Sequence, residues 1–121
     1  MKNILLVFAG GGIGSVIRYL VSTFFPAAPG TFPFATFIVN ITGSLLIGFL
    51  MGNFMSDSAF QENWKLLLVT GFCGGFTTFS AFSKESFIMI QNQQWGMFLL
   101  YVLLSVIICI GATALGFLIS K

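Results

Sequence analysis

The chain has 121 residues, of which 57% are hydrophobic and only 7% are charged, and its formal net charge is +2. Because soluble domains carry about 25% charged residues, this composition indicates a membrane protein, and the lack of a basic patch excludes a nucleic-acid-binding protein. With no histidine and three acidic residues, the sequence offers almost nothing for acid–base or nucleophilic catalysis, so we expect no enzyme.

The first predicted element is a membrane-spanning helix at residues 4–25. A spanning helix needs about 20 apolar residues, so the whole chain is long enough for about four. A signal peptide is the weaker alternative, because the run is long for one and is interrupted by Arg18. Gly10 and Gly14 form a small-xxx-small pair, which allows another helix to approach closely.

Arg18 has two interpretations of equal weight. Its side chain can extend along the helix so that the guanidinium reaches the membrane interface near Pro26. Alternatively, it can act as a cation that attracts anions into a vestibule.

The second predicted helix covers residues 34–55 and carries Asn40, with Gly43, Ser44 and Gly48 on the same face. The Asn40 amide can bond to a neighbouring helix, or it can line a pore and offer two N–H donors to an anion. We favour the pore. A polar loop at residues 56–64, which holds Asp57 and Glu62, is expected to follow.

The third predicted helix, residues 66–91, contains the most unusual stretch of the chain, GFCGGFTTFSAFS at residues 71–83. Adjacent glycines weaken a helix, so we expect a break at Gly74 and Gly75. Hydroxyl side chains follow the glycine pair, and irregular backbone at membrane depth must be buried in protein or line a wet cavity. The stretch therefore predicts an ion or polar-solute site; a simple packing kink is the alternative.

Three phenylalanines in this stretch, Phe76, Phe79 and Phe82, recur every three residues and are expected to share one broad helix face. Aromatic ring edges are weakly positive, so they can contact an anion without binding it tightly. Weak, multiple contacts favour conduction. The bare carbonyl groups at the break would instead favour a cation.

The fourth predicted helix covers residues 96–119, where Tyr101 and Ser105 lie one turn apart. The two cysteines, Cys73 and Cys109, lie in apolar runs and are expected to be buried free thiols. Lysine and arginine divide three against two between the two sides of such a bundle, which is too even to fix an orientation. An antiparallel homodimer would resolve this, with a twofold axis in the membrane plane.

These residues resemble the fluoride channel family (Fluc, also called CrcB) over nearly the whole chain. The matching motifs are GGGIG at residues 10–14, RY at 18–19, GT at 30–31, VN at 39–40 with Gly43, and the 71–83 stretch. The resemblance implies an all-α membrane protein: four transmembrane helices, the third broken, in a dual-topology antiparallel homodimer with two fluoride pathways. It further implies passive fluoride export across a bacterial plasma (inner) membrane.

The resemblance also assigns residues. Phe79 and Phe82 would be the pore phenylalanines, Asn40 would contact the permeating ion, and Arg18 would match the first-span arginine. Carbonyl groups of Gly74 and Thr77 would hold a structural sodium ion at the dimer centre. Ser80 and Thr113 would belong to a polar track, and Tyr101 would line the path. Many relatives carry threonine where this chain has Ala81, so one hydroxyl of that track is missing.

Two other classes of membrane protein fit the sequence less well. A small multidrug transporter also has four spans, but it needs a membrane carboxylate, and the first span here has none. A structural membrane subunit without transport would explain the small residues and the phenylalanine packing, but it leaves Asn40 and the polar break unexplained.

Overall fold

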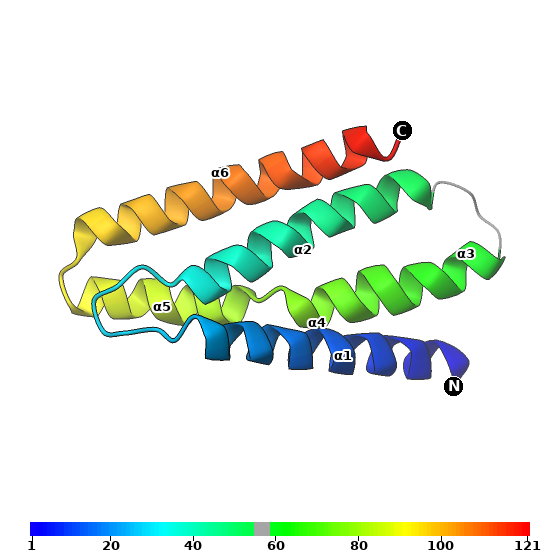
Figure 1. The fold of residues 1–121 in the computed structure, drawn as a ribbon, viewed down its shortest axis with the longest axis horizontal. Helices are drawn as coiled ribbons and strands as arrows, with labels where there is room; N and C mark the ends of the chain where they lie inside the picture. Colours follow the sequence, from blue (N-terminus) through cyan, green and yellow to red (C-terminus); the bar gives the residue numbers. More distant parts are fainter. Residues whose placement is uncertain (55–58) are drawn as a thin grey trace.

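Every regular element in the described part of the chain is a helix (Figure 1). The computed structural model describes residues 1–54 and 59–121. The first, second and fourth long helices are α1 (Lys2–Phe24), α2 (Phe34–Asn53) and α6 (Trp95–Ile119). Between α2 and α6 lie four shorter pieces, which are α3 (Ala59–Trp64), the π-helical segment η1 (Lys65–Cys73), α4 (Gly74–Phe76) and α5 (Phe79–Gln91).

Four stretches within the described residues are long and apolar enough to cross a membrane. They are Lys2–Phe24, Phe34–Asn53, Gln61–Gln91 and Trp95–Ile119. The prediction of four spanning helices with a broken third is therefore confirmed, and the chain is a multi-pass membrane protein.

The prediction of a polar loop at residues 56–64 is wrong for its second half. Residues Ala59–Trp64 form α3, which continues directly into η1. This segment contains no proline or glycine, and its alanine, glutamine and glutamate are good helix formers, so its polarity does not stop the helix. Asp57 and the predicted end of the second helix at Met55 lie outside the described residues.

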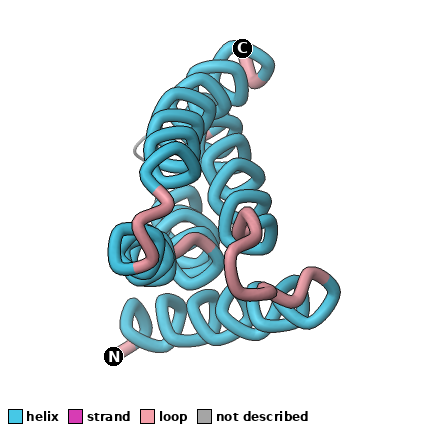
Figure 2. The backbone as a smooth tube through the Cα atoms, turned by 90° about the vertical axis from the view of Figure 1, so that its left-hand side faces the viewer, coloured by secondary structure: helices cyan, strands magenta, loops and turns pink. Residues whose placement is uncertain are grey.

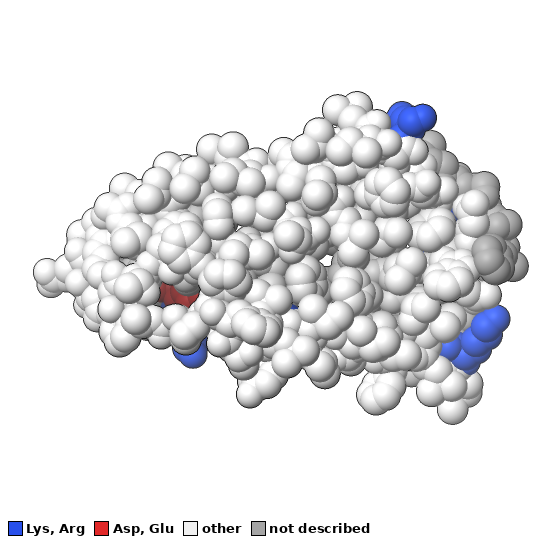
Figure 3. All heavy atoms as spheres, in the orientation of Figure 1, with Lys and Arg blue, Asp and Glu red and all other residues white. Residues whose placement is uncertain are grey.

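The helices run roughly along one long axis, with both chain termini at the same end (Figure 1). Viewed from the end, the N-terminal helix lies along one edge of the molecule and the C-terminal helix reaches the opposite edge (Figure 2). Helix α2 packs most extensively on α6, and α1 packs on η1 and α4. The face shown in Figure 3 is almost uncharged, and its lysine and arginine atoms lie mainly toward the two ends of the long axis. An apolar face of this kind suits contact with a bilayer.

Glycines allow α1 to approach the third span at backbone distance. A Cβ atom at Gly10 would overlap the Leu67 carbonyl oxygen, and one at Gly14 would overlap the carbonyl oxygen of Phe72. The predicted small-xxx-small contact is therefore confirmed, and its partner is the third span of the same chain. On the other side of this contact, a Cβ atom at Gly75 would overlap the carbonyl oxygen of Gly11.

The predicted position of the helix break is wrong by a few residues. Gly74 and Gly75 are helical, and α4 ends only at Phe76. Thr77 (φ −76°, ψ 157°) and Thr78 (φ −150°, ψ 115°) are extended, and α5 begins at Phe79. Gly75 is required for close packing on α1, whereas hydrogen bonds from other helices hold the break itself, as described below.

Candidate functional site

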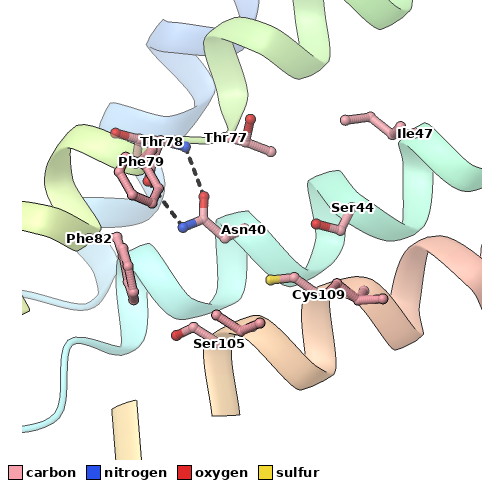
Figure 4. Close-up of a pocket in the computed structure, with 11 residues that line it drawn as sticks. Asn40, Ser44, Ile47, Thr77, Thr78, Phe79, Phe82, Ser105 and Cys109 are labelled. Carbon is pink, nitrogen blue, oxygen red and sulfur yellow. Dashed lines mark hydrogen bonds between the residues drawn. The ribbon is translucent and has the colours of Figure 1, made fainter. Parts of the chain in front are cut away.

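Asn40 on α2 makes a paired hydrogen bond to the backbone of Thr78 at the break (Figure 4). The Thr78 N–H donates to Asn40 Oδ1 at 2.8 Å, and Asn40 Nδ2 donates to the Thr78 carbonyl oxygen at 3.1 Å. A buried backbone group without a partner is costly, and Thr78 is buried. Asn40 therefore supplies both bonds that Thr78 lost on leaving the helix. One of its two N–H donors is engaged in this way, and no residue that the structure describes accepts from the other.

Two side chains of α1 also form hydrogen bonds to the segment beside the break. Arg18 Nε donates to the Gly75 carbonyl oxygen at 3.1 Å, and the Ser15 hydroxyl donates to the same oxygen at 3.4 Å. In a continuous helix, the Gly75 carbonyl group would accept a hydrogen bond from the N–H of residue 79. Because a new helix starts at residue 79, that bond is missing, and the Arg18 and Ser15 side chains donate to the carbonyl group instead. Arg18 is half-buried, and this hydrogen bond holds its guanidinium against the Gly75 carbonyl group.

The side chain of Thr78 caps the N-terminus of α5. Its Oγ1 accepts from the Ala81 N–H at 3.2 Å, which is the bond of a helix N-cap, and it pairs with the Ser80 hydroxyl at 3.1 Å. Ser80 is thereby joined to the break. Ala81 takes part through its backbone N–H, which needs no side-chain hydroxyl.

A cavity of about 350 Å³ lies beside the break, between α2, α5 and α6 (Figure 4). Three of the predicted site residues line this cavity: Asn40, Phe79 and Phe82. The fold therefore brings these three side chains together. The rings of Phe79 and Phe82 lie 5.5 Å apart at an interplanar angle of 43°. The cavity is mostly apolar, with the amide, hydroxyl and thiol groups concentrated on α2, the break and α6.

The prediction that three phenylalanines share one face is wrong. Phe76 is buried and stacks on Phe72 at 5.7 Å, whereas Phe79 is 78% exposed. The two extended residues between them change the helical phase, so a spacing of three no longer places side chains on the same face. Only Phe79 and Phe82 belong to the cavity.

The other residues predicted for the pathway, which are Arg18, Ser80, Tyr101 and Thr113, do not line this cavity. Tyr101 is fully buried, and its ring packs against that of Phe82 at 5.2 Å. The Thr113 hydroxyl donates to the carbonyl oxygens of Ser44 and Cys109, so it joins α6 to α2. Arg18 lines a different cavity, of about 380 Å³, between α1, α2 and α5.

Glu85, which is not among the residues predicted for the site, connects helices α2, α5 and α6. Its Oε1 accepts from the Thr36 hydroxyl at 2.6 Å, and its Oε2 accepts from the Tyr101 hydroxyl at 2.7 Å. Glu85 also lines the same cavity as Arg18. The available signal was that it is the last acidic residue of the chain and lies one turn after Phe82.

Ser105 and Cys109 also line the cavity beside the break, although the sequence suggested only packing for them. The missed signal is a spacing of four residues: Tyr101, Ser105, Cys109 and Thr113 fall on one stripe of α6.

The fold and site together define a small multi-pass membrane protein with a polar break and a lined cavity at membrane depth. A family model described as "CrcB-like protein, Camphor Resistance (CrcB)" matches residues 5–117. The chain belongs to this family.

Named relatives are similar over their whole length. The chain is 44% identical to "Fluoride-specific ion channel FluC" of Flavobacterium psychrophilum, over 100% of this chain and 98% of the relative. It is 41% identical to the protein of that name from Azobacteroides pseudotrichonymphae, with the same coverage. For the protein of that name from Methanococcus maripaludis, the identity is 44% over 99% of this chain and 97% of the relative.

Proposed function

We propose that this protein is a fluoride-selective ion channel that allows cytoplasmic fluoride to leave the cell passively. The observation that carries the proposal is the cavity at the break, where the Asn40 amide faces Phe79 and Phe82. The names of the full-length relatives agree with it.

The chemistry of this cavity suits a small, strongly hydrated anion. The second N–H of Asn40 is available to such an anion, while the first keeps the amide fixed on Thr78. The edges of the two phenylalanine rings offer weak positive contacts. Several weak contacts allow an anion to enter without being trapped, as conduction requires. No fixed positive charge lines this cavity among the described residues, so tight anion binding is avoided.

We further propose that two antiparallel copies form the working channel. Phe79 is 78% exposed, and Gly74 is also exposed, although both adjoin the site. A site with its aromatic wall open to one side is incomplete in a single chain. A second copy related by a twofold axis in the membrane plane would cover this wall and give each pathway residues from both chains.

A sodium ion at the centre of this dimer fits the free carbonyl groups of the break. The Thr78 N–H donates to Asn40 instead of Gly74, and the Ala81 N–H donates to the Thr78 hydroxyl instead of the Thr77 carbonyl. No hydrogen bond between described residues ends on either of these carbonyl oxygens. Two copies would therefore offer four oxygens, which are the ligands that a hard cation prefers.

The test is ion efflux from liposomes that contain the purified protein, with fluoride and chloride measured in parallel. We expect rapid loss of fluoride and retention of chloride. Phe82→Ile, which removes an aromatic edge from the cavity, should slow fluoride efflux by about tenfold or more. Phe87→Ile is the matched control, because Phe87 lies on the same helix, is exposed and does not line the cavity.

Absence of fluoride efflux from folded protein would overturn the channel function. Equal slowing by Phe82→Ile and Phe87→Ile would keep the channel and overturn the assignment of the cavity as its pathway.

A further inference from the structure

Two side chains on α6, Ser105 and Cys109, add a hydroxyl and a thiol to the lining of the cavity beside the break. Ser105 is only 7% exposed, and its hydroxyl has no hydrogen-bond partner among the described residues. Cys109 is a free, partly exposed thiol one helical turn further along. Both line the cavity, and Figure 4 shows both on the side of α6 that faces α2.

We propose that Cys109, supported by Ser105, is a binding site for a soft monovalent metal cation such as Ag⁺, and that the bound metal blocks the channel. The blocking effect rests on the proposed function, whereas the binding does not.

The softness of sulfur determines the class of metal. Thiolates select soft cations, and a coordinating thiol loses its proton. The reaction forms one sulfur–silver bond and releases one proton to water, so no oxidant or reductant is needed. The charge of a monovalent cation is then cancelled by the thiolate. A divalent cation would leave a net positive charge in an apolar cavity, which is unfavourable.

Ser105 has the placement that such a complex needs. Residues four apart on a helix are neighbours on its surface, so the Ser105 hydroxyl can rotate to donate to the Cys109 sulfur. A buried hydroxyl without a partner carries a desolvation cost, and this bond would remove it. Ser105 is therefore a positioning residue, and Cys109 Sγ is the ligand.

The other cysteine provides an internal control. Cys73 is completely buried and lines none of the cavities described above. A metal at Cys73 would have to open the contact between η1 and its neighbours, whereas one at Cys109 enters an existing space of about 350 Å³. Because that space is shared with Asn40 and Phe82, an occupied Cys109 would obstruct the proposed ion path.

The experiment uses the full-length protein in chloride-free nitrate buffer, with silver nitrate as the probe. Silver bound per chain is measured by native mass spectrometry, and fluoride efflux from liposomes is measured separately. Cys109→Ser should bind one silver ion fewer per chain than the unsubstituted protein. The silver concentration that halves fluoride efflux should be at least about tenfold higher for Cys109→Ser than for the unsubstituted protein. Cys73→Ser should behave as the unsubstituted protein in both measurements.

Equal silver binding by Cys109→Ser and the unsubstituted protein would overturn the site. Block that persists unchanged in Cys109→Ser would also overturn it. If no variant carries fluoride, the stoichiometry still decides the metal site, and the proposed channel function fails independently.

Discussion

The side chain of Asn40 and the backbone of Thr78, 38 residues apart in sequence, form a two-way hydrogen bond across the middle of the bundle. This bond gives a partner to both the N–H and the carbonyl group of Thr78 where the third span leaves helical geometry. It also fixes the amide beside Phe79 and Phe82. One residue thus holds the break and faces the proposed ion path.

Removing the Asn40 amide should therefore affect stability as well as conduction. Asn40→Ala leaves the N–H and carbonyl group of Thr78 unpaired, and each buried unpaired group costs about 1–3 kcal/mol. We expect the free energy of unfolding in detergent to fall by about 2–6 kcal/mol. Asn53→Ala is the control, because the Asn53 amide donates to Phe49 within its own exposed helix end. Equal stability of the two variants would contradict the role of Asn40 at the break.

Tyr101 should contribute through its hydroxyl as well as its ring. Tyr101→Phe keeps the packing on Phe82 but removes the bond to Glu85, and should lower the free energy of unfolding by about 1–3 kcal/mol. Tyr19→Phe makes the same change at a side chain that is 67% exposed and should be nearly neutral. Thermal unfolding in detergent compares the two; a neutral Tyr101→Phe would mean that Glu85 is not held through this hydroxyl.

The contact between α1 and the third span should tolerate a methyl group at one glycine and not at another. Gly14→Ala would place its Cβ against the backbone of Phe72, and overpacking of this kind costs about 1–3 kcal/mol. Gly12→Ala meets no atom within 4 Å, and in a helix it should stabilise by up to about 1 kcal/mol. Melting temperatures should move in opposite directions. A shift of the same sign for both variants would place the α1 contact elsewhere.

Removal of sodium should test the proposed dimer centre. If carbonyl groups of Gly74 and Thr77 hold the ion, replacing sodium with N-methyl-D-glucamine should reduce fluoride efflux and weaken the dimer, because four carbonyl oxygens would then face one another unpaired. Efflux and the dimer fraction in size-exclusion chromatography are measured before and after sodium is restored. Unchanged values in sodium-free buffer would contradict the cation site.

Structural features that depend on local composition could be predicted from the sequence. Features that depend on contacts between residues far apart in the chain could not. Four spans follow from hydropathy, and the close approach of Gly10 and Gly14 follows from side-chain size. The break was expected at Gly74 and Gly75 because glycine has low helix propensity. Its actual position depends on the Asn40 side chain, which no local rule connects to Thr78.

Glu85 was missed for the same physical reason. Its two hydroxyl partners, Thr36 and Tyr101, lie 49 and 16 residues away, on helices whose mutual rotation the sequence does not give. The prediction of a shared phenylalanine face is wrong because it requires one continuous helix from Phe76 to Phe82, whereas Thr77 and Thr78 are extended. Asn40 lies in one motif, and Phe79 and Phe82 lie in another, so these residues could be predicted as a group only through the resemblance to the fluoride channel family, which has both motifs.

The order along the chain of the residues that bond to the break has a consequence for biosynthesis. Ser15, Arg18 and Asn40, which bond to the break, all precede it in the chain. During N-to-C synthesis, each of these partners leaves the ribosome before the segment that needs it. The partners of Gly75 and Thr78 have therefore already been synthesised when the third span enters the lipid. A circular permutant that begins at α3 would insert the break before its partners exist, and we expect it to be retained at the translocon and degraded.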